Sequence, residues 1–415
     1  MEQVSAILLF DDGRGDLGPL SDLRASFEQR TGGLTLLECA VALRTHPVRV
    51  ATGRQYAALV AERLGAEATA PVAAAICVNG RMHARMDAAL REKFDALHAG
   101  AAIVDRDGSI VAARLAGSAL QSFIASVAAG SPQLSAEIAV TTTDIPLWSR
   151  PWHLLDATRF GSAIAADIEA VSATWEASER GVLPAHAAHV GVERLHIHAT
   201  ARVGVGVVFD TTGGAILIDR GAEVRHGSII TGPAFVGAKT IVSDRSVIKA
   251  RTALGPQCRA AGEIGSVIFQ GCTNKAHDGH LGDALLGEWV NLGAGTINSN
   301  LLNTYGDVAM RLRPSGPLER TGRQFMGCII GDHAKLAIGT RIMTGASIGT
   351  GAMWAAGAAV IGAIEPFAWV TDDGERRFRL DKFMEIATTV MARRGRSPLA
   401  AESATIATIH SASPG

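Results

Sequence analysis

The sequence has no excess of charge of either sign. Its 39 Lys and Arg residues are balanced by 40 Asp and Glu residues, which gives a formal net charge of -1 and a pI near 6.9. This balance argues against a basic surface that would bind nucleic acid through bulk charge, and also against an acidic tail. No nucleic-acid partner is therefore expected.

Cysteine is scarce and apolar runs are short. The five cysteines are scattered without a C-x-x-C pair, so the sequence indicates reduced thiols in a cytoplasmic protein and no disulfide framework or zinc cage. The N-terminus lacks the basic region of a signal peptide, and no apolar run is long enough to span a bilayer. We therefore expect a cytoplasmic protein without a membrane segment, and 415 residues give room for two or three domains.

The C-terminal half carries a regular aliphatic repeat. From Ile218 to Ala260 an aliphatic residue or alanine returns at every sixth position, and the repeat continues from Ile330 to Val360. An α-helix repeats at about 3.6 residues and a strand at 2, so neither explains this period. The period fits triangular coils built from three hexapeptides, with the aliphatic residue pointing inward. Residues 190–365 are therefore predicted to form a left-handed parallel β-helix.

Residues 1–180 show the pattern of an α/β domain. Strand-like runs at 4–10, 48–51 and 75–78 alternate with helical spacing at 34–43 and 55–64, and a hairpin is indicated around Asp107 and Gly108. A helix within 152–175 is expected to connect the domains. Residues 366–395 are expected to carry a C-terminal helix, and residues 396–415, rich in Ser, Ala and Pro, are expected to be disordered.

The aliphatic ladder fails between Ala260 and Leu286 and again between Leu292 and Ile330. These stretches hold the densest polar chemistry of the chain: residues 274–283 read NKAHDGHLGD, and residues 289–300 read WVNLGAGTINSN. Solenoid coils accommodate insertions as protruding loops, which commonly carry a site. The polar residues of both stretches are therefore candidates for catalysis or binding.

These two runs resemble the acetyltransferase half of the bifunctional N-acetylglucosamine-1-phosphate uridylyltransferase/glucosamine-1-phosphate acetyltransferase family. The corresponding stretch of that family reads approximately NHLxYxGD and then VNIGAGTIxxN. Aligning Asn291 with the asparagine of VNIGAGT places His277 on the family's catalytic histidine without a gap. The resemblance implies that His277 is the general base for acyl transfer to an amino-sugar phosphate, with Asn291 as a second catalytic residue.

The same resemblance implies two sets of binding residues. The substrate set is Lys275, Asp278, His280 and Asn300, with His280 in place of a tyrosine of the family. The set expected to bind acetyl-CoA or another acyl-CoA is Gly293, Ala294, Cys328, His333 and Lys335. Backbone amides near Gly293 and Ala294 are expected to polarise the thioester carbonyl. Leu301 stands where the family has another tyrosine, which leaves the acceptor open.

The first loop resembles the glycine loop of the nucleotidyltransferase half of that family. Residues 6–20 read AILLFDDGRGDLGPL, and this opening, the PLxxxR run and the VNGR run at 78–81 are more similar to a divergent subgroup of sugar nucleotidyltransferases that carry the same β-helix. The resemblance implies a site for a nucleoside triphosphate and a sugar 1-phosphate, with Mg²⁺ if the domain is active. Its expected nucleotide-binding residues are Asp11, Asp12, Gly13, Arg14, Gly15 and Arg24.

Several alternatives stay open. As a less favoured alternative, His277 and His280 would only cap a loop. His333 and Lys335 would equally lie on a solvated corner, and the acidic pair would equally end the first strand in a turn. The histidines between residues 186 and 198 favour solvent-exposed rung positions over zinc ligands, and the histidine spacing of the γ-type carbonic anhydrases is missing. The alternative function is a non-catalytic or regulatory sugar-nucleotide-binding protein, or one active domain. The resemblance implies a homotrimer.

Overall fold

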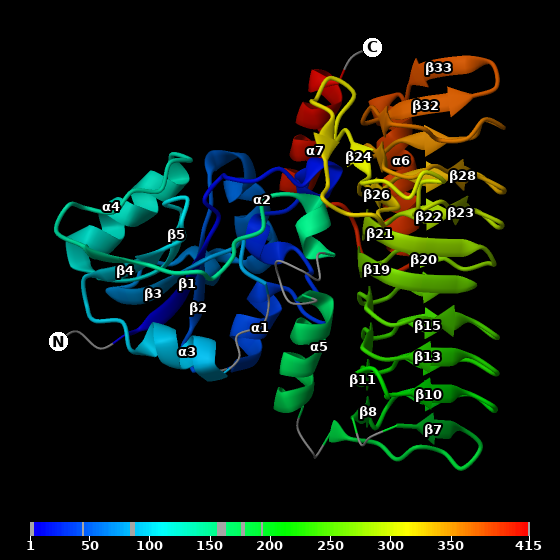
Figure 1. Ribbon diagram of the computed structural model, residues 1–415. Coiled ribbons are helices and arrows are strands. Elements are labelled where there is room, and N and C mark those ends of the chain that lie inside the picture. The colour runs from blue at the N-terminus through cyan, green and yellow to red at the C-terminus, as the bar shows by residue number, and fades with distance from the viewer. Residues whose placement is uncertain are drawn as a thin grey trace.

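The structure is a computed structural model that describes residues 4–43, 45–83, 88–155, 163–175, 179–191 and 194–413. An α/β domain lies beside a tall β-helix, whose coils stack from green to orange in Figure 1. Helix α5 (Ala163–Thr174) runs between the two bodies. The helix expected within 152–175 is therefore present from residue 163, and residues 156–162 lie outside the described residues.

A six-stranded sheet forms the centre of the N-terminal domain. Its order is β2-β1-β3-β5-β4-β6, with β1 parallel to β2 and β3, and β5 antiparallel to β3 and β4. The strands are β1 (Ala6–Phe10), β2 (Val48–Ala51), β3 (Ala74–Asn79), β4 (Ala101–Val104), β5 (Ile110–Ala116) and β6 (Ala139–Thr142). Helices α1 (Leu36–Leu43), α2 (Arg54–Leu64) and α3 (Ala88–Asp95) cover one face, and α4 (Gly117–Ala128) covers the other. Burial on both faces explains the continuous apolar runs of β1 and β3.

The β-helix has three faces of parallel strands. The first face contains β7 (Ala188–Val190), β10 (Val208–Asp210), β13 (Ile229–Thr231), β16 (Val247–Ile248) and the first residues of β19 (Glu263–Gly271) and β21 (His280–Glu288), followed by β23 (Ile297–Asn298) and β28 (Arg341–Ile342). The second contains β8 (Leu195–Ile197), β11 (Ile216–Ile218), β14 (Ala234–Val236), β17 (Thr252–Leu254), the later residues of β19 and β21, β26 (Cys328–Ile330), β29 (Ala346–Ile348) and β31 (Ala363–Ile364). The predicted fold class is confirmed.

The third face forms a ten-stranded sheet. Its strands are β9 (Arg202–Val203), β12 (Glu223–Val224), β15 (Ile241–Val242), β18 (Arg259–Ala260), β20 (Asn274–Lys275), β22 (Asn291–Leu292), β27 (Lys335–Leu336), β30 (Met353–Trp354), β32 (Ala368–Thr371) and the antiparallel β33 (Gly374–Arg377). The aliphatic residues of the repeat fill the interior of the coils, as the period predicts.

The first break in the ladder is not a protruding loop. The coils continue through it, with Ile264 paired to Ile248, Phe269 paired to Leu254 and Lys275 paired to Ala260. The period is lost because some corners contain fewer residues, so the next inward-pointing residue comes earlier in the sequence than the period of six predicts. The expectation of a loop insertion between Ala260 and Leu286 was therefore wrong.

The second break is a true insertion. Residues 299–327 leave the coil after β23 and contain a short antiparallel pair, β24 (Ala309–Met310) and β25 (Glu319–Arg320). Val308, Met310 and Leu312 pack in one apolar cluster with Leu20 of the N-terminal domain and with the outward side chains of the second face. The insertion therefore helps to join the two domains.

The predicted disorder of residues 396–415 was wrong for most of that segment. Helix α6 (Leu380–Ala392) is followed by helix α7 (Ala400–Ala412), and Ile406 of α7 is buried in a cluster with Leu23 and Phe383. The carboxylate of Glu62 in α2 accepts hydrogen bonds from the Ala400 and Ala401 amides at 3.0 and 2.6 Å, which caps α7. Packing against the rest of the protein thus orders a segment whose Ser- and Ala-rich composition predicted disorder. Residues 414 and 415 lie outside the described part.

Candidate functional site

His277 lies on an exposed corner of the β-helix. The corner joins Lys275, the last residue of β20, to His280, the first residue of β21, and the side chains of His277 and Asp278 are exposed. Gly279 closes the corner at φ 112°, and an added Cβ would lie 2.4 Å from the Thr296 carbonyl oxygen of the next coil. Only glycine meets both conditions. The corner of residues 277–279 is therefore packed tightly against that of residues 294–296.

The side chain of Lys275 does not reach the exposed surface of this corner. The side chain points into the coil and is 1 % exposed. Its Nζ donates hydrogen bonds to the carbonyl oxygens of Ala261, His277 and Asp278 at 3.2, 2.9 and 2.9 Å. The expected substrate contact of Lys275 was therefore wrong, because the residue occupies an inward position of the repeat.

His280 is oriented by a carboxylate. Parallel pairing places His280 opposite Glu263, and the His280 Nδ1 lies 3.3 Å from the Glu263 Oε1. The ammonium group of Lys249 pairs with the same carboxylate. Its hydrogen bond holds the pKa of Glu263 below the ordinary value. The carboxylate can therefore fix the imidazole of His280, with Nδ1 directed toward Glu263.

Asn300 converges with His280 above Gly282. An added Cβ at Gly282 would lie 2.7 Å from both the Asn300 Nδ2 and the His280 Nε2. The Asn300 Nδ2 donates to the Asp283 Oδ2 at 2.8 Å, and Arg323 of the insertion lies 3.5 Å from the Asp283 Oδ1. Burial raises the pKa of Asp283. The structure thus brings two predicted residues, His280 and Asn300, into one polar cluster with Asp283, Glu263 and Arg323.

Asn298 supports this cluster and was not predicted. Its carboxamide accepts a hydrogen bond from the Gly282 amide and donates one to the Gly282 carbonyl, both at 2.8 Å. These bonds take the place of the backbone ladder between β21 and β23 at this point. Asn298 occupies an inward position of the repeat, where other coils carry an aliphatic residue. A polar residue at this position was a signal in the sequence that could have identified it.

The predicted acyl-CoA residues are divided between the interior and the surface. Cys328 is buried in the coil, where burial raises the pKa of its thiol to about 12. His333 is 2 % exposed, stacked on Trp289 with centroids 6.2 Å apart and in edge contact with Phe383 of α6. The predicted contacts of both residues with acyl-CoA were therefore wrong, because the coil core and the C-terminal helix cover them.

Gly293 also departs from its expected role. Its amide donates to the Leu336 carbonyl at 2.9 Å as part of the sheet, so it is not available to polarise a thioester. Asn291 lies on the third face, in register with Asn274 and Lys335. The Lys335 ammonium donates to the Trp289 carbonyl, and burial lowers its pKa to about 8. Asn291, Ala294 and Lys335 are only partly covered, so they remain candidates for ligand contact.

The acidic pair after β1 is fully engaged inside the N-terminal domain. Asp11 accepts hydrogen bonds from the Gly13 and Ser26 amides at 2.9 and 2.6 Å. Asp12 forms a buried ion pair with Arg81 at 2.7 Å and accepts a bond from Asn79 at 2.9 Å. Asn79 and Arg81 belong to the VNGR run, so the sequence contained this signal although neither residue was assigned a role.

The same contacts determine whether Asp11 and Asp12 can bind Mg²⁺. A magnesium ion needs free carboxylate oxygens, whereas donors within the protein already occupy those of Asp11 and Asp12. Within the described ranges, no group of three His, Cys, Asp or Glu residues is arranged to hold a metal ion. The residues present do not fit a magnesium site.

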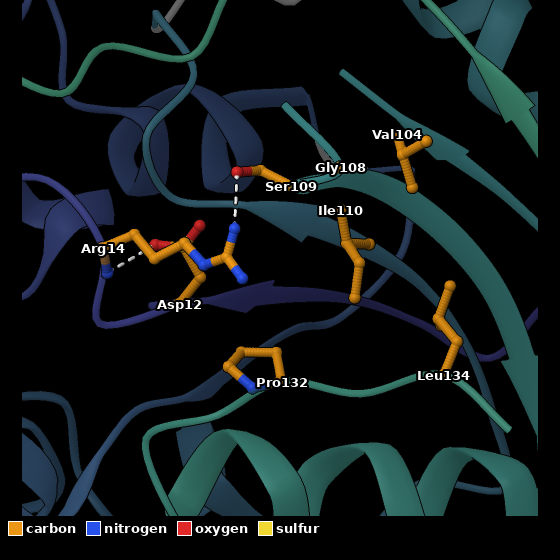
Figure 2. Close-up of a pocket in the computed structure, with 8 residues that line it drawn as sticks. All are labelled: Asp12, Arg14, Val104, Gly108, Ser109, Ile110, Pro132 and Leu134. Carbon is orange, nitrogen blue, oxygen red and sulfur yellow. Dashed lines mark hydrogen bonds between the residues drawn. The ribbon is translucent and has the colours of Figure 1, made fainter. Parts of the chain in front are cut away.

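A small pocket opens beside this loop. Arg14 extends across it, and its Nη1 donates to the Ser109 Oγ at 3.2 Å (Figure 2). The volume is about 190 Å³, below the roughly 300–1,000 Å³ of common ligand sites. The pocket can accommodate a phosphate or part of a sugar, whereas a whole nucleoside triphosphate needs more space.

Arg24 does not line this pocket and borders a second cavity of about 570 Å³ between the domains, together with Arg30, Arg63 and Arg396. It is buried between the domains, where its Nη2 lies 3.0 Å from the Asp332 Oδ1 of the β-helix. The segment from Gly18 to Glu28 docks on the coils, with the Asp22 carboxylate accepting a hydrogen bond from Thr350 at 2.6 Å, and its Ser26 amide bonds back to Asp11. Arg24 is therefore an interdomain residue.

The histidines near the start of the β-helix do not form a common site. His189 bonds to Thr211, and His198 bonds to Thr200, each at 2.9 Å. His196 is buried against Ser172 at 2.7 Å and stacks on Trp175, so its predicted exposure was wrong. Each imidazole thus has its own partner on a different segment.

Comparison with known proteins places this geometry in context. Residues 7–174 match the model of a family described as sugar nucleotidyl transferase. The chain is 29 % identical over 150 residues to a bifunctional sugar-1-phosphate nucleotidylyltransferase/acetyltransferase of Sulfurisphaera tokodaii, covering 35 % of this chain and 37 % of that protein. It is 31 % identical over 175 residues to the bifunctional protein GlmU of a Cyanothece species, covering 36 % of this chain and 37 % of that protein. The chain thus spans little more than a third of the length of these relatives.

The solved structures that match this chain include acyltransferases. One is a UDP-N-acetylglucosamine acyltransferase of Francisella novicida, with a TM-score of 0.31 and 16 % identity, covering 52 % of this chain and 74 % of that chain. Another is a polysialic acid O-acetyltransferase, with a TM-score of 0.24 and 13 % identity, covering 46 % of this chain and 88 % of that chain. On the sequence matches, the N-terminal domain is similar to the sugar nucleotidyl transferase family, in a chain that resembles the bifunctional sugar-1-phosphate nucleotidylyltransferase/acetyltransferases.

Proposed function

We propose that this chain is a transferase of sugar-nucleotide synthesis, which transfers an acetyl group from acetyl-CoA to the amine of an amino-sugar phosphate. The observation that carries the proposal is the corner of His277, which directly precedes His280, while His280 forms a cluster with Glu263 and Asn300 of the neighbouring coils. An exposed imidazole beside an imidazole oriented by a carboxylate supplies the groups needed to take up and pass on a proton. The names of the curated relatives support a transferase.

The residues divide the chemistry as follows. Acetyl-CoA supplies the acyl group. The amine of the acceptor loses a proton to the His277 imidazole as it attacks the thioester carbonyl, and the thiolate takes a proton as it leaves. Asn300 and His280, held above Gly282, are placed to bind the hydroxyl or phosphate groups of the sugar. Asp278 is exposed beside His277 and is placed for a further polar contact.

The N-terminal domain is proposed to bind a phosphate-bearing sugar or nucleotide at the pocket of Arg14 and Ser109. Arg14 supplies the positive charge, and the Ser109 hydroxyl lines the same pocket. The neutralisation of Asp12 by Arg81 favours a second candidate function for this domain, which is binding without nucleotidyl transfer. A chain with one active domain, in the β-helix, agrees with both observations.

A homotrimer is proposed as the active assembly. Ile338, on the same edge of the β-helix as His277 and Ala294, is 79 % exposed, and Val205 lower on this edge is 59 % exposed. Exposed apolar side chains at these two places on the edge support contact with a second copy of the chain. Separately, none of the described helices is both long and apolar enough to cross a membrane. We propose a cytoplasmic location.

The test is an assay that follows free thiol and pyrophosphate separately. The protein is incubated with amino-sugar 1-phosphates, acetyl-CoA, nucleoside triphosphates and magnesium. Thiol release that is lost in His277→Ala, while the trimer measured by light scattering persists, supports acyl transfer. The absence of thiol release with every amino sugar contradicts it. Pyrophosphate release that depends on Arg14 contradicts the binding-only role of the N-terminal domain.

A further inference from the structure

Lys275 is a buried charge at a position that the β-helix otherwise fills with an apolar side chain. It pairs with Ala260 of the coil below, and because Asn274 pairs with Asn291, Leu292 takes the equivalent place in the coil above. Ala260 and Leu292 belong to the apolar core, and Lys275 is 1 % exposed. The ammonium group therefore lies inside the coil.

Backbone carbonyls satisfy this ammonium group completely. An ammonium has three N–H donors, and the structure gives it three acceptors, on Ala261, His277 and Asp278. No ion pair of the described residues includes Lys275. Burial lowers the pKa of Lys275 to about 8, with the charge of Asp278 acting in the opposite direction.

A buried lysine without a carboxylate partner is costly for stability. Removing an ammonium group from water is unfavourable, and an apolar side chain of similar volume often stabilises such a site. Stability alone therefore does not explain why a lysine stands here. Two of its three acceptors are carbonyls of the corner that carries the exposed side chains of His277 and Asp278, which indicates a role at that corner.

We propose that Lys275 is a positioning residue, whose ammonium group fixes the corner of residues 276–279 in the conformation that presents His277 to the acceptor amine. The inference rests on the proposed acyl transfer. Each of the corner carbonyls of His277 and Asp278 is bound from inside the coil, so the backbone of the corner cannot turn without losing these bonds. An imidazole displaced by about 1 Å can lose roughly 100-fold in rate.

The variant Lys275→Met tests this role because it keeps the length of the side chain and removes the ammonium group. We expect kcat for thiol release to fall roughly 10- to 100-fold, while KM for acetyl-CoA changes by less than about twofold. Amide hydrogen exchange at residues 276–279 is expected to become faster. Leu292→Met is the matched control at the same place in the next coil, and both readouts are expected to stay as in the wild type.

The variant Lys275→Gln keeps two N–H donors without the charge, and an intermediate kcat is expected. If Lys275→Met does not fold, the same comparison is made with Lys275→Gln. A kcat within about twofold of the wild type, or unchanged exchange at residues 276–279, overturns the proposal. If the wild type transfers no acyl group, the proposed function fails, whereas the exchange comparison still decides whether Lys275 holds the corner.

Discussion

Arg24 and Asp332 join the two domains through a buried ion pair, although 308 residues separate them in the chain. The guanidinium Nη2 lies 3.0 Å from the Asp332 Oδ1, and the two side chains are 6 % and 1 % exposed. The same Oδ1 accepts a hydrogen bond from the Glu288 amide at 2.6 Å. The segment after the glycine loop is therefore bound to the coil that also carries His333 and Lys335, so the domains are expected to unfold together.

Removal of one partner of this pair should be strongly destabilising. In Arg24→Met the Asp332 carboxylate stays buried without its counterion, so the free energy of unfolding is expected to fall by about 3–5 kcal/mol. Denaturant unfolding measures the change. Arg202→Met, at an exposed pair with Glu223, is the control and should cost less than about 1 kcal/mol. Equal losses in the two variants would contradict the interdomain role of Arg24.

A methyl group at Gly282 should separate the two groups that converge there. Gly282→Ala places a Cβ 2.7 Å from the His280 Nε2 and the Asn300 Nδ2, which are ends of flexible side chains and can move away. We expect the KM for the amino sugar to rise about tenfold with little loss of stability. Gly322→Ala tests a glycine with positive φ and open space around it, and its KM should not change. An unaltered KM in Gly282→Ala would remove this cluster from the substrate site.

The sequence predicted the repeat because the apolar interior of each coil imposes its period on every sixth residue. It could not show that the coils continue from Ala260 to Ile264, because a shortened corner shifts the period without a local signal. The contact between Arg24 and Asp332 depends on the docking of two domains, which no local pattern encodes. Helix α7 was missed for the same reason, since its order comes from the burial of Ile406 and the cap by Glu62.

The structure brings some of the predicted site residues together and turns others into the coil, while their roles remain a prediction. His280 and Asn300 meet because parallel coils place residues of neighbouring turns side by side. Lys275 and Cys328 were assigned to ligands because their positions match the family's motif, yet both point into the coil. Since side chains alternate between the interior and the surface along a strand, a shift of a single residue reverses the direction.

The buried lysine also predicts a pH dependence of stability. The pKa of Lys275 falls from 10.5 to about 8 on folding, so between these values the unfolded chain binds more protons than the folded chain. The free energy of unfolding should therefore rise as the pH increases from about 8 to 10.5, by at most about 3 kcal/mol from this residue. Urea unfolding at both ends of this range measures the rise. Lys275→Met should show a smaller rise, and an equal rise in both proteins would contradict the burial of the charge.

The pair of Asp12 and Arg81 predicts that magnesium alone does not stabilise the wild-type protein. Arg81 and Asn79 already supply the donors for the Asp12 carboxylate, so a cation would have to displace a buried guanidinium. The unfolding temperature is expected to be the same in magnesium chloride as in sodium chloride of equal ionic strength. Arg81→Ala leaves two buried carboxylates side by side, which should cost about 3–5 kcal/mol.

Magnesium should restore part of this loss in Arg81→Ala, because the cation then replaces the missing positive charge. Arg106→Ala, at an exposed pair with Asp144, is the control. This substitution should not lower the unfolding temperature, and magnesium should not raise it. A magnesium-dependent rise of the unfolding temperature in the wild type, abolished in Asp12→Asn, would show that the acidic pair binds the metal. In that case the N-terminal domain would have to rearrange around Arg81 before it could transfer a nucleotidyl group.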